Sequence, residues 1–267
     1  MSARIYGDLC EGLVARGWSV EARPSNRSCF DGAARHPGRE ERNGVSYRRV
    51  RRPAFAQGTG RGRVLNAMWM TAAWSARALR PGRGPDVVLV GTDPILSVFT
   101  LSVFKMFRPS TRRVHWAFDV YPDAAVADGA LREGSLLARL LARVARAGVQ
   151  AADLVADIGA CMRERLPAAP GAVRVTLPPW ALVEPAAPLE SDPEERKRLF
   201  GDARLGVLYS GTFGRAHSHE ELLALARRLR GTGIRFVFSV RGNREAELRA
   251  AVRADDGNVS FAPFVEE

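Results

Sequence analysis

The segment Asp86-Val-Val-Leu-Val-Gly91-Thr-Asp-Pro94 is a continuous apolar run that ends in glycine and polar residues. Strands of a parallel sheet are buried on both faces, so they are unbroken apolar runs and do not alternate. The apolar stretch 95–107 follows directly and predicts a helix. This order of strand and helix predicts an α/β fold with a parallel sheet.

The same order recurs on both sides of this segment. Short apolar runs predict further strands at 18–22, 45–50, 113–118 and 154–157. Amphipathic stretches predict helices at 3–16, 64–79, 136–147 and 160–166. A proline-rich stretch at 177–192 interrupts the pattern, which restarts with a strand at 205–209. We therefore expect two Rossmann-like domains, at 1–180 and 204–267, joined by a linker at 181–203.

Two glycine-containing turns follow predicted strands after the restart. They are Leu208-Tyr-Ser-Gly-Thr-Phe-Gly-Arg-Ala-His217 and Ser239-Val-Arg-Gly-Asn-Arg244. Glycine lets the backbone approach a phosphate closely, a helix N-terminus favours anions, and the Arg215 guanidinium can bind a diphosphate directly. The carboxyl ends of parallel strands meet at one edge, so the two turns together favour a phosphate site. Ordinary strand–helix turns with a solvated arginine are the alternative.

Two acidic turns follow predicted strands in the first half. They are Gly91-Thr-Asp-Pro94 and Asp119-Val-Tyr-Pro-Asp123. A carboxylate in such a turn can orient a substrate hydroxyl or act as a base. Aspartate close to proline can equally stabilise the turn itself. Both interpretations stay open for Asp119, whereas the turn is the favoured interpretation for Asp93.

The charge is strongly positive, but its composition limits what it implies. The 267 residues carry a net charge of +11, and Lys105 and Lys197 are the only lysines among 40 basic residues. A general bias towards arginine explains this as well as attraction to phosphate donors, anionic membranes or nucleic acid. The sequence has no recognised nucleic-acid-reading motif, so we do not expect nucleic acid as a partner.

The cysteines and apolar runs exclude several classes of protein. Cys10, Cys29 and Cys161 lack metal-ligand spacing and a histidine cluster, so we expect reduced thiols in a cytoplasmic protein and no metal. No P-loop or GxGxxG fingerprint indicates a bound cofactor. The run 95–107 falls short of the roughly 20 apolar residues of a spanning helix. This run and the basic helix 136–147 suit either core packing or peripheral contact with an anionic membrane.

Several of these motifs together resemble the GT-B glycosyltransferases, specifically the large retaining family-4 group. The segments that carry the resemblance are FDVYPD (118–123), TLPPWALVEP (176–185), LYSGTFGRAHSHEELL (208–223), IRFVFSVRGNREAEL (234–248) and NVSFAPFVEE (258–267). The resemblance implies that the first domain binds the acceptor and the second the nucleotide sugar. It also implies metal-independent transfer, with retention, from a UDP- or GDP-sugar to a polysaccharide or lipid-linked acceptor.

The resemblance also implies roles for individual residues. Asp119 matches the acidic position of the acceptor loop and is the expected catalytic residue. In the two glycine turns, the glycines would lie beneath the donor phosphates and beside the nucleotide, and Arg215 would contact the diphosphate. His217 stands near the position where the group usually has a lysine. The expected donor-binding residues are Gly211, Gly214, Arg215, His217 and Gly242.

The chain departs from the pattern of this group at both ends. The group begins with a strand and a glycine-containing loop before the first helix, and it ends with further strand–helix units that contain a glutamate pair. Glu266 and Glu267 precede that pair in the order of the group. We therefore expect the first strand to be missing and the second domain to be incomplete. The alternative functions are an inactive fragment or binding remnant of such an enzyme, and a sugar-nucleotide epimerase of the same fold.

Overall fold

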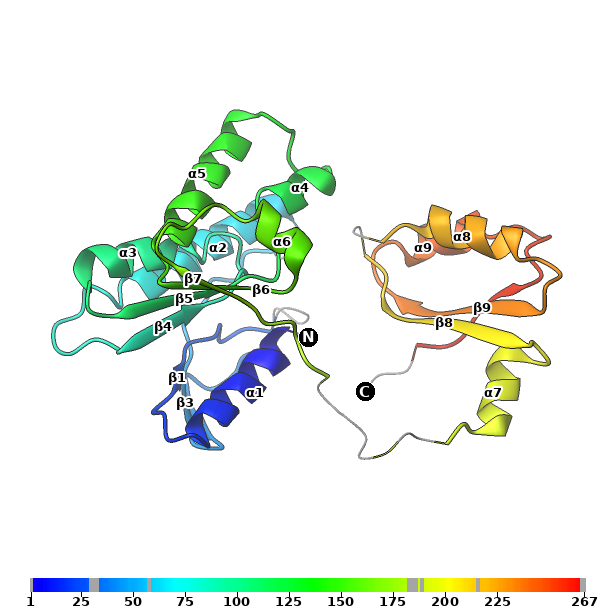
Figure 1. Ribbon diagram of the computed structural model, residues 1–267, viewed down its shortest axis with the longest axis horizontal. Helices are drawn as coiled ribbons and strands as arrows, with labels where there is room; N and C mark the ends of the chain where they lie inside the picture. Colours follow the sequence, from blue (N-terminus) through cyan, green and yellow to red (C-terminus); the bar gives the residue numbers. More distant parts are fainter. Residues whose placement is uncertain are drawn as a thin grey trace. The chain divides into compact units, whose positions relative to one another are not determined.

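The computed structural model of the protein describes residues 2–28, 34–56, 59–181, 187, 190–214 and 217–264. The chain divides into two compact units, Met1–Val183 and Glu184–Glu267, and Figure 1 shows the elements of each. Both units combine helices with sheets of mainly parallel strands. The predicted α/β class is therefore confirmed.

A four-stranded parallel sheet lies at the centre of the first unit, with the order β4-β5-β6-β7. The strands are β4 (Val87–Val90), β5 (Arg112–Trp116), β6 (Leu154–Asp157) and β7 (Val173–Thr176). The apolar runs predicted the first three of these strands. They did not predict β7, because Arg174 and Thr176 alternate with its valines. In this sheet, Arg113 of β5 donates from its backbone and its guanidinium to the Asp153 carboxylate, both at 2.7 Å.

Helices cover both faces of this sheet. The helices of the first unit are α1 (Ser2–Val14), α2 (Gly60–Ser75), α3 (Phe99–Phe107), α4 (Asp123–Ala127), α5 (Leu136–Gln150) and α6 (Ala160–Arg165). On one face, Leu101 of α3 and Val149 of α5 pack with Val155 of β6. On the other face, Ile5 of α1 packs against Trp116 and Ala156. Core packing therefore explains the inward side of the run 95–107.

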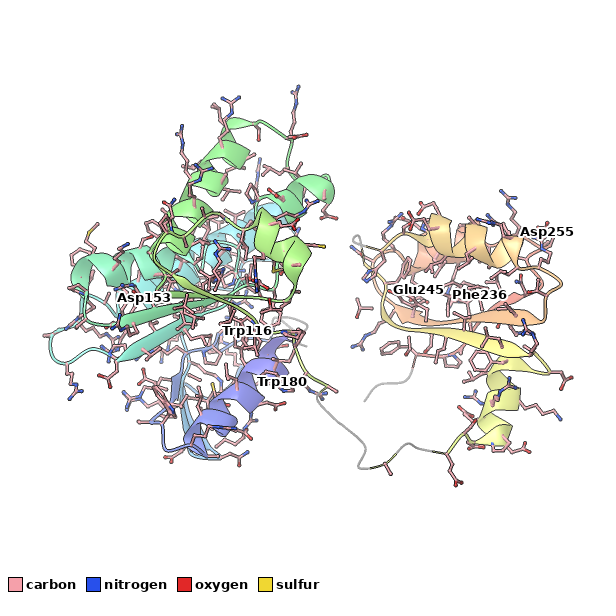
Figure 2. All side chains as sticks on the ribbon, in the orientation of Figure 1. Trp116, Asp153, Trp180, Phe236, Glu245 and Asp255 are labelled. Carbon is pink, nitrogen blue, oxygen red and sulfur yellow. The ribbon has the colours of Figure 1, made fainter. Side chains whose placement is uncertain are left out.

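The segment that follows β7 returns to α1. The Trp180 ring stacks on Trp116 with the ring centroids 5.7 Å apart, and Figure 2 labels this pair. The Trp180 indole N–H also donates to the Asp8 carboxylate at 3.2 Å. The loop after the last strand is thereby held against the first helix of the unit.

A second, smaller sheet in the first unit corrects one expectation. Its strands are β1 (Glu21–Ala22), β2 (Arg39–Arg42) and β3 (Val45–Arg48), in the order β1-β3-β2. β1 pairs with β3 in parallel, but β2 pairs with β3 antiparallel. The sequence predicted no strand at β2, because Arg-Glu-Glu-Arg contains no apolar residue. The turn at Asn43 and Gly44, whose φ angles are 50° and 76°, folds β2 back onto β3.

The second unit has a three-stranded parallel sheet with the order β10-β9-β8. Its elements are α7 (Pro193–Phe200), β8 (Leu205–Thr212), α8 (His219–Arg228), β9 (Ile234–Arg241), α9 (Glu245–Ala251) and β10 (Val259–Phe261). Leu223 of α8 and Leu248 of α9 pack with the buried phenylalanines of β9. α7 lies within the stretch expected as a linker and contacts β8 and β9 from the other face (Figure 1). Asp192 caps its N-terminus.

Candidate functional site

The turns that follow β4 and β5 are joined at the carboxyl edge of the main sheet. The Thr92 hydroxyl accepts hydrogen bonds from the backbone N–H groups of Phe118, at 2.8 Å, and Asp119, at 3.4 Å. Below this link, the buried His115 imidazole Nδ1 lies 3.0 Å from the Val90 carbonyl oxygen. Burial lowers the pKa of His115 to about 4, so this imidazole is neutral at pH 7. The two turns therefore form one continuous edge.

This edge brings Asp93 and Asp119 together. Burial, and next the negative charge of Asp119, raise the pKa of Asp93. Burial also raises the pKa of Asp119. Surrounding protein removes part of the water from both carboxylates, which raises their pKa values. Both side chains are nevertheless exposed, so a ligand can reach them. The structure thus places Asp93, which the sequence favoured as a turn residue, beside the expected catalytic residue.

Two tyrosines border the carboxylates. Burial, and then the charge of Asp93, raise the pKa of Tyr6, and its hydroxyl lies 3.5 Å from the Trp116 carbonyl oxygen. Burial, and then the charge of Asp119, raise the pKa of Tyr121, while the Arg63 guanidinium acts in the opposite direction. At neutral pH both hydroxyls keep their protons and can donate hydrogen bonds.

Sequence reasoning missed Tyr6 because it lies on α1, far along the chain from the acidic turns. The one sequence feature that reflects the position of Tyr6 is the glycine at position 91. A Cβ atom at Gly91 would lie 2.1 Å from the Tyr6 hydroxyl oxygen, so the tyrosine approaches the edge only where a side chain is absent. Tyr121 belongs to the Asp119-Val-Tyr-Pro-Asp123 motif, but that motif alone does not show on which side its ring lies.

The two glycine turns meet at the carboxyl edge of β8 and β9. Gly211 and Gly242 have φ angles of 147° and 142°, a region that favours glycine. A Cβ atom at Gly242 would lie 2.3 Å from the Phe213 carbonyl oxygen, whereas a Cβ atom at Gly211 would meet nothing within 4 Å. The Phe213 N–H donates to the Arg241 carbonyl at 2.7 Å. Bare backbone of both turns is thereby held side by side.

His217 closes the first of these turns onto itself. Its Nδ1 accepts a hydrogen bond from the Gly214 N–H at 3.1 Å, and its ring stacks on Phe213 with the centroids 5.5 Å apart. Arg244, from the second turn, donates to the His217 carbonyl at 2.9 Å. Four expected donor residues, Gly211, Gly214, His217 and Gly242, therefore lie in one small region. The fifth, Arg215, lies outside the described residues.

A hollow on the described surface lies elsewhere in the second unit. Its lining includes Asp192, Glu195, Arg196, Phe200 and Leu205, and it lies where α7 meets the start of β8. Ligands of parallel α/β sheets bind outside the carboxyl ends of the strands, and this hollow lies at the amino end. We therefore assign the candidate site to the glycine turns and the acidic turns.

Within the described ranges, no three His, Cys, Asp or Glu side chains gather closely enough to hold a metal ion. Among the helices described, none combines the length and the apolar content that crossing a membrane requires. No protein-family model matches the chain, and no curated protein sequence matches it either.

Proposed function

We propose that this protein is a retaining glycosyltransferase of the GT-B type, which moves a sugar from a UDP- or GDP-sugar to a polysaccharide or lipid-linked acceptor. The second unit binds the donor and the first unit binds the acceptor. The reaction forms a bond between an acceptor oxygen and the anomeric carbon, and it breaks the bond between that carbon and a diphosphate oxygen. The acceptor proton passes to the Asp119 carboxylate.

The observation that carries the proposal is the meeting of the two glycine turns at one sheet edge. Phosphates bind where backbone N–H groups are accessible and no side chain intervenes. The backbone at Gly211 and Gly242 carries no side chain and is not buried, and both residues have backbone angles that favour glycine. The contact between Gly242 and Phe213 leaves no room for a Cβ atom. A nucleoside diphosphate fits this kind of edge.

The acidic edge of the first unit supports the acceptor half of the proposal. A carboxylate with a raised pKa is a stronger base at neutral pH than an ordinary aspartate. Repulsion between Asp93 and Asp119 weakens when a hydroxyl donates a hydrogen bond to either of them. A sugar acceptor carries several such hydroxyls, and the Tyr6 and Tyr121 hydroxyls offer donors for its oxygens.

Exposed apolar side chains on the helix of Arg63 favour a lipid-linked acceptor over a free glycan. Arg63 influences Tyr121 electrostatically, so the first turn of α2 lies near the acidic edge. Large apolar side chains are exposed on α2 and just before it, at Phe55, Val64, Leu65, Met68 and Trp69. Such a patch suits the hydrocarbon part of an acceptor whose sugar lies against the carboxylates.

Donor binding is tested by hydrogen exchange of the β8 and β9 amides in the presence of a panel of nucleotides and nucleotide sugars. We expect one UDP- or GDP-sugar to slow this exchange in a concentration-dependent manner. Arg215→Ala should remove the effect, whereas Arg228→Ala, a change of the same type on α8, should preserve it. If no nucleotide slows exchange, the chain lacks a donor site, and the alternative of an inactive remnant replaces the proposal.

The acceptor half is tested separately. Asp119→Asn should leave donor binding intact and abolish sugar transfer to a lipid-linked acceptor. Asp86→Asn is the matched control, because Asp86 is an exposed aspartate that precedes β4 at the opposite edge of the same sheet. Equal activity of the two variants would exclude Asp119 from the reaction.

A further inference from the structure

The side chains of α5 fall into three sectors. With about 3.6 residues per turn, Ala138, Ala145 and Val149 share one side of the helix. Ala138 and Val149 are buried, and so is the neighbouring Gly148. A second sector consists of arginines that are all exposed, namely Arg139, Arg143 and Arg146. The third consists of leucines with exposed fractions of 84%, 54% and 56%, namely Leu136, Leu137 and Leu140.

Core packing explains the second half of α5, whereas in the first turn it involves Ala138 and leaves the neighbouring leucines exposed. In the second half, a Cβ atom at Gly148 would lie 2.6 Å from the Val98 carbonyl oxygen, so α5 and the residues that begin α3 are in backbone contact. Lys105 of α3 donates to the Gln150 carbonyl at 3.3 Å. The first half extends beyond the sheet, as Figure 1 shows, and is ordered by Ser135, whose hydroxyl caps the helix. Leu136, Leu137 and Leu140 of this half are each more than half exposed.

The charges on α5 indicate what covers this surface. The helix contains no acidic residue, and among the described residues none of its three arginines forms an ion pair. A second copy of the chain docked on the leucines by two-fold symmetry would bring the two sets of arginines close together, which is unfavourable. An anionic lipid surface instead provides hydrocarbon for the leucines and phosphates for the arginines.

We propose that the first half of α5 is a membrane-docking surface, made by Leu136, Leu137 and Leu140 with Arg139, Arg143 and Arg146. The leucines enter the boundary between headgroups and acyl chains of an anionic bilayer, and the arginines lie along the lipid phosphates. This surface does not depend on the glycosyltransferase proposal, because it uses none of the residues of the acidic edge or the glycine turns.

Cosedimentation with vesicles tests the surface. The full chain should bind vesicles of phosphatidylcholine and phosphatidylglycerol, bind pure phosphatidylcholine less, and dissociate as salt is added. Each arginine near an anionic surface contributes about fivefold, so the loss of three arginines should weaken binding on the order of 100-fold, and R139E/R143E/R146E, which also adds three repelled carboxylates, by more than that. L136Q/L137Q/L140Q should also lose binding. The matched control is L225Q/R228E on α8, which changes a leucine of 46% exposure and an exposed arginine and should bind like the parent.

The outcomes distinguish the possible occupants. Vesicle binding that both α5 variants retain would overturn the proposal, as would an absence of binding by the parent. A parent dimer that L136Q/L137Q/L140Q converts to a monomer, without vesicle binding, would assign the surface to a second copy. If a variant fails to fold, hydrogen exchange of the parent decides. Vesicles should then protect the amides of the first half of α5, and unchanged exchange there would overturn the proposal.

Discussion

Replacement of Gly242 by alanine tests how the second unit holds its two turns together. The φ angle of Gly242 is 142°, and an ideal Cβ atom would lie 2.3 Å from the Phe213 carbonyl oxygen and 2.9 Å from the carbon of that carbonyl. Gly211 provides a matched control, because its φ angle is 147° and its Cβ atom would meet nothing within 4 Å. The pair separates backbone strain from steric contact.

The two substitutions should differ by the cost of the contact. A side chain in an unfavourable backbone region costs about 1–3 kcal/mol, and both variants carry this cost. Gly242→Ala must also displace the backbone of Phe213, whose side chain is fully buried, and such overpacking costs about 1–3 kcal/mol. We therefore expect the second unit to lose about 1–3 kcal/mol in Gly211→Ala and about 2–6 kcal/mol in Gly242→Ala.

The distribution of the tryptophans makes the assay selective. All five lie in the first unit, so their fluorescence during denaturant unfolding reports on that unit alone. Native-state hydrogen exchange of the β9 amides reports on the second unit. Gly242→Ala should accelerate this exchange more than Gly211→Ala and leave the tryptophan transition in place. Equal acceleration by the two variants would show that the approach of Phe213 has no energetic role and would refute the reasoning.

Three further variants test other contacts. Asp256→Asn should cost about 2–3 kcal/mol in urea unfolding, because the buried carboxylate accepts hydrogen bonds from Arg227 and Arg230, which lower its pKa. This loss should begin to shrink as the pH falls below about 3.9 and should disappear only when the pH passes below the lowered pKa of the folded-state carboxyl. Asp93→Asn should gain up to about 1 kcal/mol at pH 7, since its exposed carboxylate has a raised pKa, and the gain should vanish below about pH 3.9. Gly148→Ala should cost about 1–3 kcal/mol in thermal unfolding, by separating α5 from α3.

The apolar runs predicted most of the sheets, although the structure leaves Val87 and Leu89 of β4 exposed and does not bury this strand on both faces. The run 86–91 contains β4. The strand–helix pattern that restarts after 177–192 corresponds to the sheet of the second unit. β2 contains no such run, since Arg39–Arg42 has no apolar residue and is a strand only because β3 offers it a partner. Strand formation of this kind depends on tertiary pairing and is not encoded in the segment itself.

The candidate site was predictable only in part, for a similar reason. Asp119 lies just after β5, and the glycine turns lie at the ends of β8 and β9. The order of the strands alone therefore predicts that Asp119 lies at the carboxyl edge of one sheet and the glycine turns at the carboxyl edge of the other. The contact of Tyr6 with the acidic edge depends on how α1 crosses the sheet, which no local pattern records. The leucines and arginines of α5 predicted an amphipathic helix, but the pattern does not state which sector faces the core. The structure buries the alanine sector and leaves both others exposed.

The division of α5 into an anchored and a free half has a consequence for how this protein can change over time. Substitutions beside Gly148 disturb the helix pair and are removed by selection for folding. Substitutions at the exposed Leu136, Leu137 and Leu140 of the first turns remove no buried contact, so they leave folding stability nearly unchanged, whereas Ala138 in the same turns is buried. Variation in the first half can therefore accumulate independently of the fold, and one exposed helix can acquire a different surface preference while the sheet beneath it is conserved.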